Sequence, residues 1–276
     1  MELPRTSLLT TAAAAAAAIV LRKHDADARQ AAERMAAAAL EALLNAIDAN
    51  DADTGAHVRR VATYSLIIAD EAGLSIPEQA SVERIALFHD IGKIHEALFD
   101  IIHDDKVLSP DDRRAIATHP ARGAEVLAPL DGFYPELAQG VLSHHEHWNG
   151  TGYPQRLKGR RIPIAARIVS IADSFDAITH HRRYRAGRPV EAARDIILAG
   201  RATQFDPELV DLFTFPPVFA RIAAAERQVA KWQTPIHQRR EGRDEQNVPE
   251  ISFRWRPGRR GSRGRPASDQ PRKKER

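Results

Sequence analysis

The sequence predicts an all-α fold, for three reasons. Apolar residues recur at helical spacing in one segment after another. Helix-start signals, in which a capping residue is followed by proline and an acidic residue, precede several of these segments. No convincing run of alternating apolar and polar residues predicts a strand. With 276 residues, of which 43% are hydrophobic, the chain is long enough for one large domain or two small ones.

The first predicted element is an alanine-rich helix. Residues 8–21 are apolar but fall short of the roughly 20 residues that a membrane helix needs, which argues against a full span. Alanine is the best helix former, so a helix in a cytoplasmic protein is the first interpretation. Because Arg5 precedes the run, a signal peptide or weak membrane association through residues 8–21 is the alternative. Residues 28–48 continue as a helix whose apolar stripe is expected to pack on the next domain: Met35, Leu40, Leu43, Leu44 and Ile47.

Eight further helices are expected after this one. Ser75 and Glu78 form a predicted capping box, and similar start signals begin at Ser109 and Asp206. A glycine, Gly73, ends the first of these helices. The predicted helices span residues 57–72, 77–91, 110–118, 121–128, 134–147, 164–180, 190–199 and 207–214.

The C-terminal region differs from the rest in composition. Residues 239–276 carry 13 Lys and Arg against 6 Asp and Glu, which leaves residues 1–238 with a net charge of −4. Apolar periodicity stops after Trp232, so the end of the chain is predicted to be a disordered basic tail suited to weak contact with nucleic acid or an anionic membrane. The predicted domains are 1–39, an alanine-rich helical segment; 40–215, the main helical domain; 216–235, a C-terminal helix; and 236–276, the tail.

Residues suited to metal binding gather in the main helical domain. The chain has no cysteine, which excludes a disulfide framework and a thiolate metal site, so any metal must be held by His, Asp or Glu. Each candidate alone is more often an ordinary core or surface residue, but together they can converge inside a helical bundle. Imidazoles and carboxylates suit divalent Fe or Mn, with Zn or Ni open. The candidates are Asp53, His57, His89, Asp90, His119, His144, His145 and Asp173.

Several short motifs in the same stretch resemble a known family. They are H-D-I-G-K at 89–93, H-P at 119–120, H-H-E at 144–146, G-T-G-Y-P at 150–154, I-A-D-S-F-D-A at 171–177 and Q-F-D-P at 204–207. This set looks like the HD-GYP family of bacterial cyclic di-GMP phosphodiesterases, a branch of the HD phosphohydrolases. The resemblance covers about residues 40–212, and the G-Y-P loop after H-H-E is its most specific part.

The resemblance implies an HD-type helical bundle that holds two or three divalent metal ions, Fe or Mn first. It implies hydrolysis of cyclic di-GMP to pGpG, and on to GMP, by a metal-activated hydroxide, with signalling proteins as partners. By position, the eight candidates above are the expected ligands, with Asp90 bridging two metals and Lys93 beside the solvent and the substrate phosphate. Asp53 stands where some members use Glu to hold a third metal.

Substrate contacts are expected from two segments. The first is the G-T-G-Y-P loop, through Gly150, Gly152 and Tyr153, which is interpreted as shaping the site rather than reacting. The second contributes Arg182, Tyr184 and Arg185, since arginine suits both phosphate and guanine edges. Asn149 replaces the usual Asp, and Glu146 is interpreted as orienting a neighbouring imidazole.

Three other functions stay open at this point. An HD phosphohydrolase acting on another nucleotide or cyclic dinucleotide is one, because His181 and Arg183 depart from the family pattern. A non-catalytic cyclic di-GMP signalling adaptor is another, although its usual mark, the loss of H-D or H-H, is not found. Nucleic-acid binding through the basic tail is the third.

Overall fold

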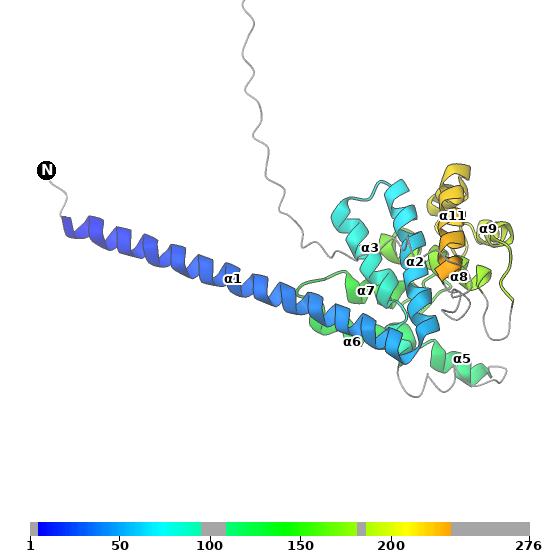
Figure 1. Cartoon of the computed structure of the whole chain (residues 1–276), viewed down its shortest axis with the longest axis horizontal. Helices are drawn as coiled ribbons and strands as arrows, with labels where there is room; N and C mark the ends of the chain where they lie inside the picture. The colour runs from blue at the N-terminus through cyan, green and yellow to red at the C-terminus, as the bar shows by residue number, and fades with distance from the viewer. Residues whose placement is uncertain (1–4, 95–108, 181–185, 233–276) are drawn as a thin grey trace, which may run out of the picture. The chain divides into compact units, whose positions relative to one another are not determined.

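The structure is a computed structural model that describes residues 5–94, 109–180 and 186–232. Its elements are α1 (Arg5–Asn50), α2 (Ala52–Glu71), α3 (Ile76–Phe88), η1 (Ile91–Ile94), α5 (Pro110–Ile116), α6 (His119–Leu127), η2 (Ala128–Leu130), α7 (Leu137–Ser143), η3 (Gly159–Arg161), α8 (Ile164–Thr179), α9 (Val190–Ala199), α10 (Pro207–Thr214) and α11 (Pro216–Trp232) (Figure 1). Outside these helices, the described residues show only an isolated bridge between Arg201 and Phe205. The predicted all-α class is confirmed.

Polar caps fix where several helices begin. The carboxylate of Glu78 accepts a hydrogen bond from the backbone N–H of Ser75, which precedes α3. Ser109 Oγ accepts one from the N–H of Asp112 at the start of α5, and Asp206 accepts one from the N–H of Glu208 at the start of α10. These bonds satisfy first-turn N–H groups that have no partner within the helix.

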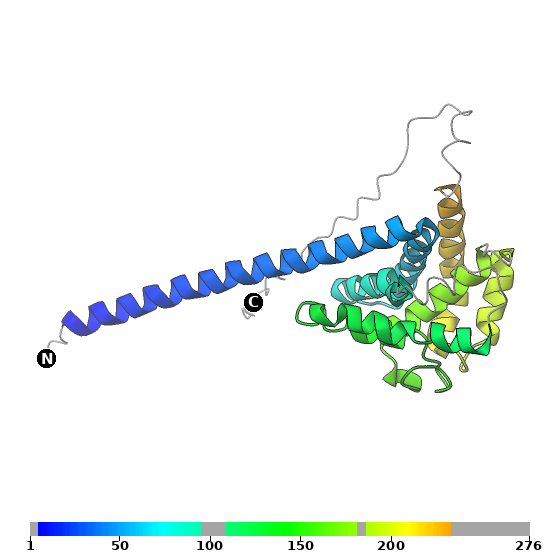
Figure 2. The ribbon, with the colours of Figure 1, turned by 90° about the horizontal axis from the view of Figure 1, so that it is seen from below.

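The hydrophobic core is built around α2 and α8. Helix α2 packs against α1, α3, α8 and α11 (Figure 1, Figure 2). The ring of Tyr64 on α2 meets that of Phe175 on α8 edge-on, with centroids 5.1 Å apart. The ring centroid of Phe213 on α10 lies 5.7 Å from that of Phe175. All three side chains are fully buried. This packing places His57 on α2 beside Asp173 on α8.

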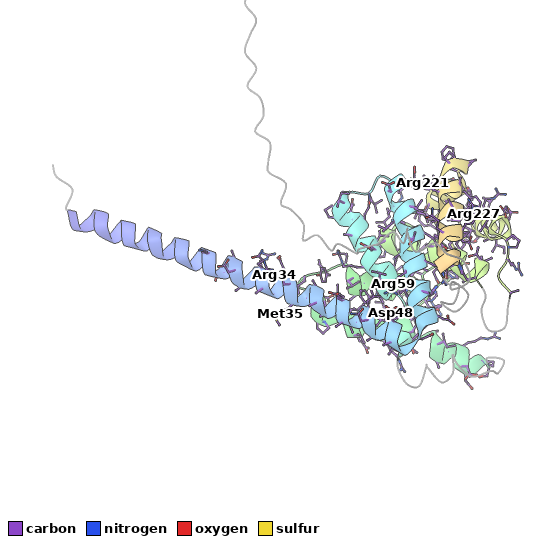
Figure 3. The ribbon with its side chains drawn as sticks, viewed as in Figure 1. Arg34, Met35, Asp48, Arg59, Arg221 and Arg227 are labelled. Atoms are coloured by element: carbon purple, nitrogen blue, oxygen red, sulfur yellow. The ribbon has the colours of Figure 1, made fainter. Side chains whose placement is uncertain are left out.

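Helix α1 joins the two alanine-rich segments into one helix of 46 residues. Leu40 and Ile47 are buried, as predicted, and Asp48 pairs with the guanidinium of Arg59 on α2. The prediction for Met35 was wrong, since it is 74% exposed (Figure 3). Ala36, which lies about 100° further round the helix, is buried on the face that contacts the domain.

No helix among the residues searched combines the length and the apolar character needed to cross a bilayer. The cytoplasmic location stays a prediction. The chain divides into two units, Met1–Gln233 and Thr234–Arg276, and the described residues all belong to the first. The predicted basic tail lies outside the described residues, and the predicted domain limits stay predictions.

Two predicted helices end three or four residues before their predicted ends, and four of the predicted ligands, His89, Asp90, His144 and His145, fall in the turns that follow. Helix α3 ends at Phe88, so His89 is its C-cap, and α7 ends at Ser143, so His144 is its C-cap. After α3, Gly92 lets the backbone of η1 approach α6 closely. A Cβ at this position would lie 2.1 Å from the carbonyl oxygen of His119. Only glycine fits there, and the close approach brings Asp90 to His119.

Candidate metal centre

Six of the eight predicted ligands form two groups. The histidine group is His119, His144 and His145, and the mixed group is His57, His89 and Asp90. Within each group, one ligand atom per residue lies within 4.8 Å of the others. Their residues come from α2, the turn after α3, the start of α6 and the end of α7. The fold therefore assembles candidate ligands from four separate stretches of the chain.

The carboxylate of Asp90 lies between the two groups. Its Oδ1 is 3.3 Å from Nε2 of His119, and its Oδ2 is 3.7 Å from Nε2 of His57 and 3.5 Å from Nε2 of His89. Lys93 donates a hydrogen bond to the same Oδ2 over 2.6 Å. Burial alone would raise the pKa of Asp90, but the Lys93 ammonium and the neighbouring imidazoles hold it well below its usual range.

The other two predicted ligands differ in position. Asp173 on α8 faces the mixed group, since its Oδ1 is 3.4 Å from Nε2 of His57 and 3.9 Å from Nε2 of His89. Asp53 lies in the exposed first turn of α2 and belongs to neither group. Its role as a ligand to a third metal stays a prediction.

Local backbone geometry aims three of the imidazoles inward. Each of these rings donates from Nδ1 to a backbone carbonyl three residues earlier. Because a carbonyl oxygen can only accept, Nδ1 carries the proton, and in the neutral ring the lone pair is then on Nε2. Such partners orient metal-binding histidines in general. The pairs are His89 with Ala86 (2.8 Å), His119 with Ile116 (2.8 Å) and His144 with Val141 (2.6 Å).

The resulting set of acceptors fits a cation. Nε2 of His119 and Nε2 of His144 face each other at 3.1 Å. His89 Nε2 and Asp90 Oδ1 are buried without a hydrogen-bond partner among the described residues. Buried acceptors are costly unless they are paired, and a divalent ion would pair them. Nitrogen and oxygen donors of this kind suit a first-row divalent metal.

The pKa values of two rings of the histidine group, His144 and His145, agree with neutral rings that are ready to bind a metal. Burial, helped by the other imidazoles, lowers the pKa of His144 well below its usual value. Burial also lowers the pKa of His145 to about 3, with Asp173 acting in the opposite direction. Metals bind the neutral form of imidazole, so neither ring has to lose a proton at neutral pH.

His57 is held differently, by residues that the sequence analysis missed. Its Nδ1 lies 2.7 Å from Oδ2 of Asp176, which is buried on α8. Arg60 donates hydrogen bonds to both carboxylate oxygens of Asp176, over 2.6 and 2.9 Å. Nδ1 of His180 lies 3.1 Å from Oδ1 of the same carboxylate. Burial lowers the pKa of His57, but the hydrogen bond to Asp176 and the nearby carboxylates of Asp90 and Asp173 outweigh this and raise it to about 9. The available signal was the second aspartate of I-A-D-S-F-D-A, one helical turn after Asp173.

The G-T-G-Y-P loop packs directly on the histidine group. The ring of Tyr153 stacks on His145, with centroids 4.9 Å apart and planes 24° apart. At Gly152 a Cβ would lie 2.2 Å from the backbone nitrogen of His147, so glycine is required for this contact. Gly150 has a φ of +85°. Burial raises the pKa of Tyr153 to about 12, which keeps its hydroxyl protonated at neutral pH.

Glu146 does not orient an imidazole as was expected. Its two carboxylate oxygens accept hydrogen bonds from the backbone N–H groups of Gln155 (2.6 Å) and Leu157 (2.9 Å), and it is 2% exposed. It therefore fastens the chain that follows Tyr153. Oδ1 of Asn149 closes a turn by accepting hydrogen bonds from the backbone N–H and the hydroxyl of Thr151. The amide oxygen of Asn is sufficient for this role, so the carboxylate of the usual Asp is not needed for the turn.

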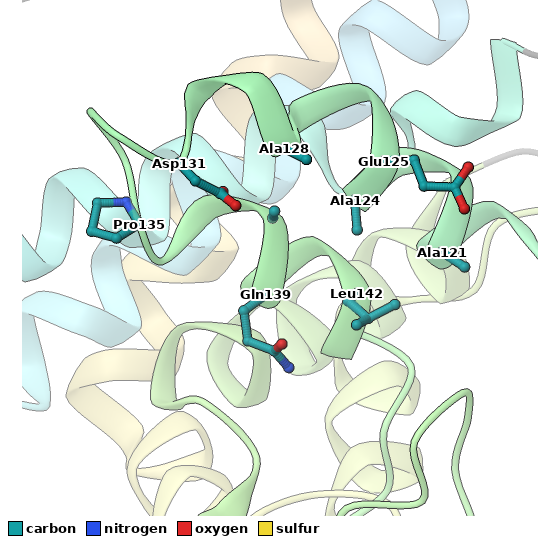
Figure 4. Close-up of a pocket in the computed structure, with 9 residues that line it drawn as sticks. Ala121, Ala124, Glu125, Ala128, Asp131, Pro135, Gln139 and Leu142 are labelled. Atoms are coloured by element: carbon teal, nitrogen blue, oxygen red, sulfur yellow. The ribbon is translucent and has the colours of Figure 1, made fainter.

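The remaining predicted contacts and the surface groove are separate from this cluster. Arg182, Tyr184 and Arg185 lie outside the described residues. A groove of about 540 Å³ runs between α6 and α7, and none of the predicted site residues lines it (Figure 4). Its walls are Ala121, Ala124, Glu125, Ala128, Asp131, Pro135, Ala138, Gln139 and Leu142.

Comparison with known proteins supports the resemblance that the motifs indicated. A family model described as HD domain matches residues 41–209. The 3'3'-cGAMP-specific phosphodiesterase 2 of Vibrio cholerae is 37% identical over 172 residues, 62% of this chain and 33% of that protein. The cyclic di-GMP phosphodiesterase response regulator RpfG of Xanthomonas campestris is 35% identical over 178 residues, 62% of this chain and 46% of that protein. A cyclic di-GMP phosphodiesterase of Thermotoga maritima is 36% identical over 176 residues, 63% of this chain and 47% of that protein. The chain thus spans between a third and a half of the length of these curated relatives.

Proposed function

Because the chain belongs to the HD domain family, we propose that it is a metal-dependent phosphodiesterase that hydrolyses cyclic di-GMP to pGpG. The observation that carries this proposal is the position of Asp90, whose two oxygens face imidazoles of both groups at 3.3 to 3.7 Å. A carboxylate in that position can bridge two ions, as two-metal hydrolysis of a phosphate ester requires. The names of the relatives from Xanthomonas and Thermotoga supply the substrate class.

We assign two ions to the site, with Fe and Mn as the first candidates. Asp90 would contribute to both. When bound, such ions lower the pKa of water and withdraw negative charge from a phosphodiester. The other proposed ligands are His57, His89 and Asp173 for one ion and His119, His144 and His145 for the other. A third ion at Asp53 stays a prediction.

Two further side chains act on the substrate in this proposal. The Lys93 ammonium is held beside Asp90 while 29% of its side chain stays exposed, so it can neutralise an oxygen of a phosphate bound at the metal groups. The hydroxyl of Tyr153 stays protonated and can donate a hydrogen bond at the rim, while its ring covers one face of His145. Asp90 and Lys93 are therefore the proposed catalytic residues.

A second cyclic dinucleotide is the alternative substrate. The relative with 37% identity carries a name that specifies 3'3'-cGAMP. Both substrates are anionic phosphodiesters, so the metal groups alone do not choose between them. The choice would depend on contacts to the bases, for which Arg182, Tyr184 and Arg185 remain the predicted residues.

One experiment tests the function and the role of Asp90 together. The purified chain is loaded with Mn(II) or Fe(II) and incubated with cyclic di-GMP or 3'3'-cGAMP, and products are separated by chromatography. We expect pGpG from cyclic di-GMP, and loss of turnover in Asp90→Ala with helical content kept. The matched control is Asp195→Ala, which removes an exposed carboxylate on α9. A metal-loaded wild-type chain that converts neither compound would contradict the function, and full activity in Asp90→Ala would contradict the mechanism.

A further inference from the structure

Residues 155–161, Q-R-L-K-G-R-R, form an unusually basic loop beside the candidate metal centre. We call this segment the basic loop. It follows Tyr153, whose ring stacks on His145. Arg156 is three residues beyond Tyr153, so their Cα atoms are separated by at most about 11 Å. That separation is comparable to the distance of roughly 8–10 Å over which charges act in physiological salt.

The position of the basic loop is fixed by buried contacts. The carboxylate of Glu146 accepts hydrogen bonds from the backbone N–H groups of Gln155 and Leu157, the two neighbours of Arg156. Further along, the N–H of Gly159 donates to the carbonyl of Trp148 over 2.8 Å. Glu146 directly follows His145 in the chain. The loop is therefore tied to the same turn that presents the histidine group.

The backbone at Arg156 is held in a conformation that disfavours arginine. Its φ is +54°, in the left-handed region where glycine is relaxed and a residue with a Cβ is strained. Glycine would relieve that strain. The charged side chain of Arg156 is therefore carried at a position where glycine would be less strained.

Three cations of the basic loop are left uncompensated. Arg160 pairs with Glu208, but Arg156, Lys158 and Arg161 form no ion pair with any residue that the structure describes. All three are exposed. Residues 1–238 carry a net charge of −4, so these cations are opposite in sign to the net charge of that part of the chain. Exposed cations on a segment with a fixed backbone attract anions from solution.

We propose that Arg156, Lys158 and Arg161 capture an anionic cyclic dinucleotide and guide it to the metal groups. This inference rests on the proposed function. The cations act on the encounter with the substrate, through its two negatively charged phosphodiesters. They therefore raise the association rate constant and leave the hydrolytic step unchanged.

The test measures association directly, by stopped-flow fluorescence, with a cyclic dinucleotide in which 2-aminopurine replaces one guanine. The loop variant is Arg156→Gln, Lys158→Gln and Arg161→Gln. The control variant, Lys23→Gln, Arg34→Gln and Arg227→Gln, removes an equal number of positive charges from exposed positions on α1 and α11. Arg34 and Arg227 are labelled in Figure 3. At low salt we expect the association rate constant to fall by about tenfold in the loop variant and to stay unchanged in the control. The difference should disappear at high salt.

Two single variants separate charge from loop structure. Arg156→Gly relieves the backbone strain and removes the cation, so we expect an unchanged or higher melting temperature together with slower association. Arg156→Lys keeps the charge and should keep the rate. Unchanged association in the loop variant, an equal loss in the control, or a loss that salt does not erase would overturn the proposal. Turnover of cyclic di-GMP by the wild-type chain, followed in parallel, tests the proposed function separately.

Discussion

Asp90 lies against both the histidine group and the mixed group, but one imidazole of the mixed group, His57, is held in a different electrostatic environment from the rings of the histidine group. In the histidine group, backbone carbonyls hold His119 and His144, and burial keeps the pKa values of His144 and His145 low. In the mixed group, a buried carboxylate holds His57 and the pKa of that ring is raised to about 9. Without metal, His144 and His145 are therefore neutral, while His57 holds a proton.

This difference indicates what each group requires from a metal. An ion that enters the histidine group meets neutral rings at His144 and His145, whereas an ion that enters the mixed group must displace the proton of His57. The mixed group compensates with carboxylates, since Asp90 and Asp173 both face His57. We therefore expect the two groups to respond differently to mutation and to pH.

The largest effect is expected from removing one ligand of each group. His144→Ala should lose one metal equivalent from the histidine group, and His89→Ala one from the mixed group. Hydrolysis should fall by more than about 100-fold in both, since even the partners of metal ligands are worth 10–100-fold. Metal content by mass spectrometry and initial rates check this, with His147→Ala as the control. Loss of both equivalents from either variant would contradict two separable sites.

A smaller effect is expected from Asp176→Asn. The amide keeps the size of the side chain but weakens the charged hydrogen bonds to His57 and Arg60. We expect a 10–100-fold weaker affinity for Mn(II) at the mixed group, measured by calorimetry, and no change at the histidine group. Asp211→Asn, an exposed carboxylate on α10, is the matched control. Equal weakening at both groups would mean that Asp176 supports the fold rather than one metal.

The pH dependence should separate the groups again. Because the pKa of His57 is about 9 without metal, the ring is protonated at pH 7 and must lose that proton to bind an ion. Metal binding at pH 7 should therefore release about one proton from His57, and the affinity of the mixed group should rise with pH up to about 9. Calorimetry in two buffers with different heats of ionisation measures the release. The absence of any release below pH 9 would contradict the protonated state of His57.

The smallest effect is expected at Asp53. This side chain lies in the exposed first turn of α2, outside both groups. Because the two assigned ions are held by the other seven predicted ligands, we expect Asp53→Ala to keep both of these ions and most of the hydrolytic rate. Loss of one metal equivalent, with the other ions retained, would establish the third site that the sequence suggested.

The sequence predicted those parts of the molecule that short-range chemistry determines. Capping by Ser75, Ser109 and Asp206 marked helix starts, and the H-D and H-H motifs marked the candidate ligands. Asp176 and Arg60 were missed because their pairing joins residues 116 positions apart, which no local pattern reveals. The role of Glu146 was predicted wrongly because its partners are backbone N–H groups, which the sequence does not mark. Met35 was predicted to be buried, but a shift of one residue along a helix moves a side chain to another face.

The central claim is that Asp90 lies between two ions. Anomalous scattering from crystals of the Mn-loaded chain, recorded at the manganese absorption edge, tests it most directly. We predict one peak within bonding distance of the histidine group and one within bonding distance of the mixed group, with a carboxylate oxygen of Asp90 at each. A single peak, or two peaks that Asp90 does not join, would contradict the claim.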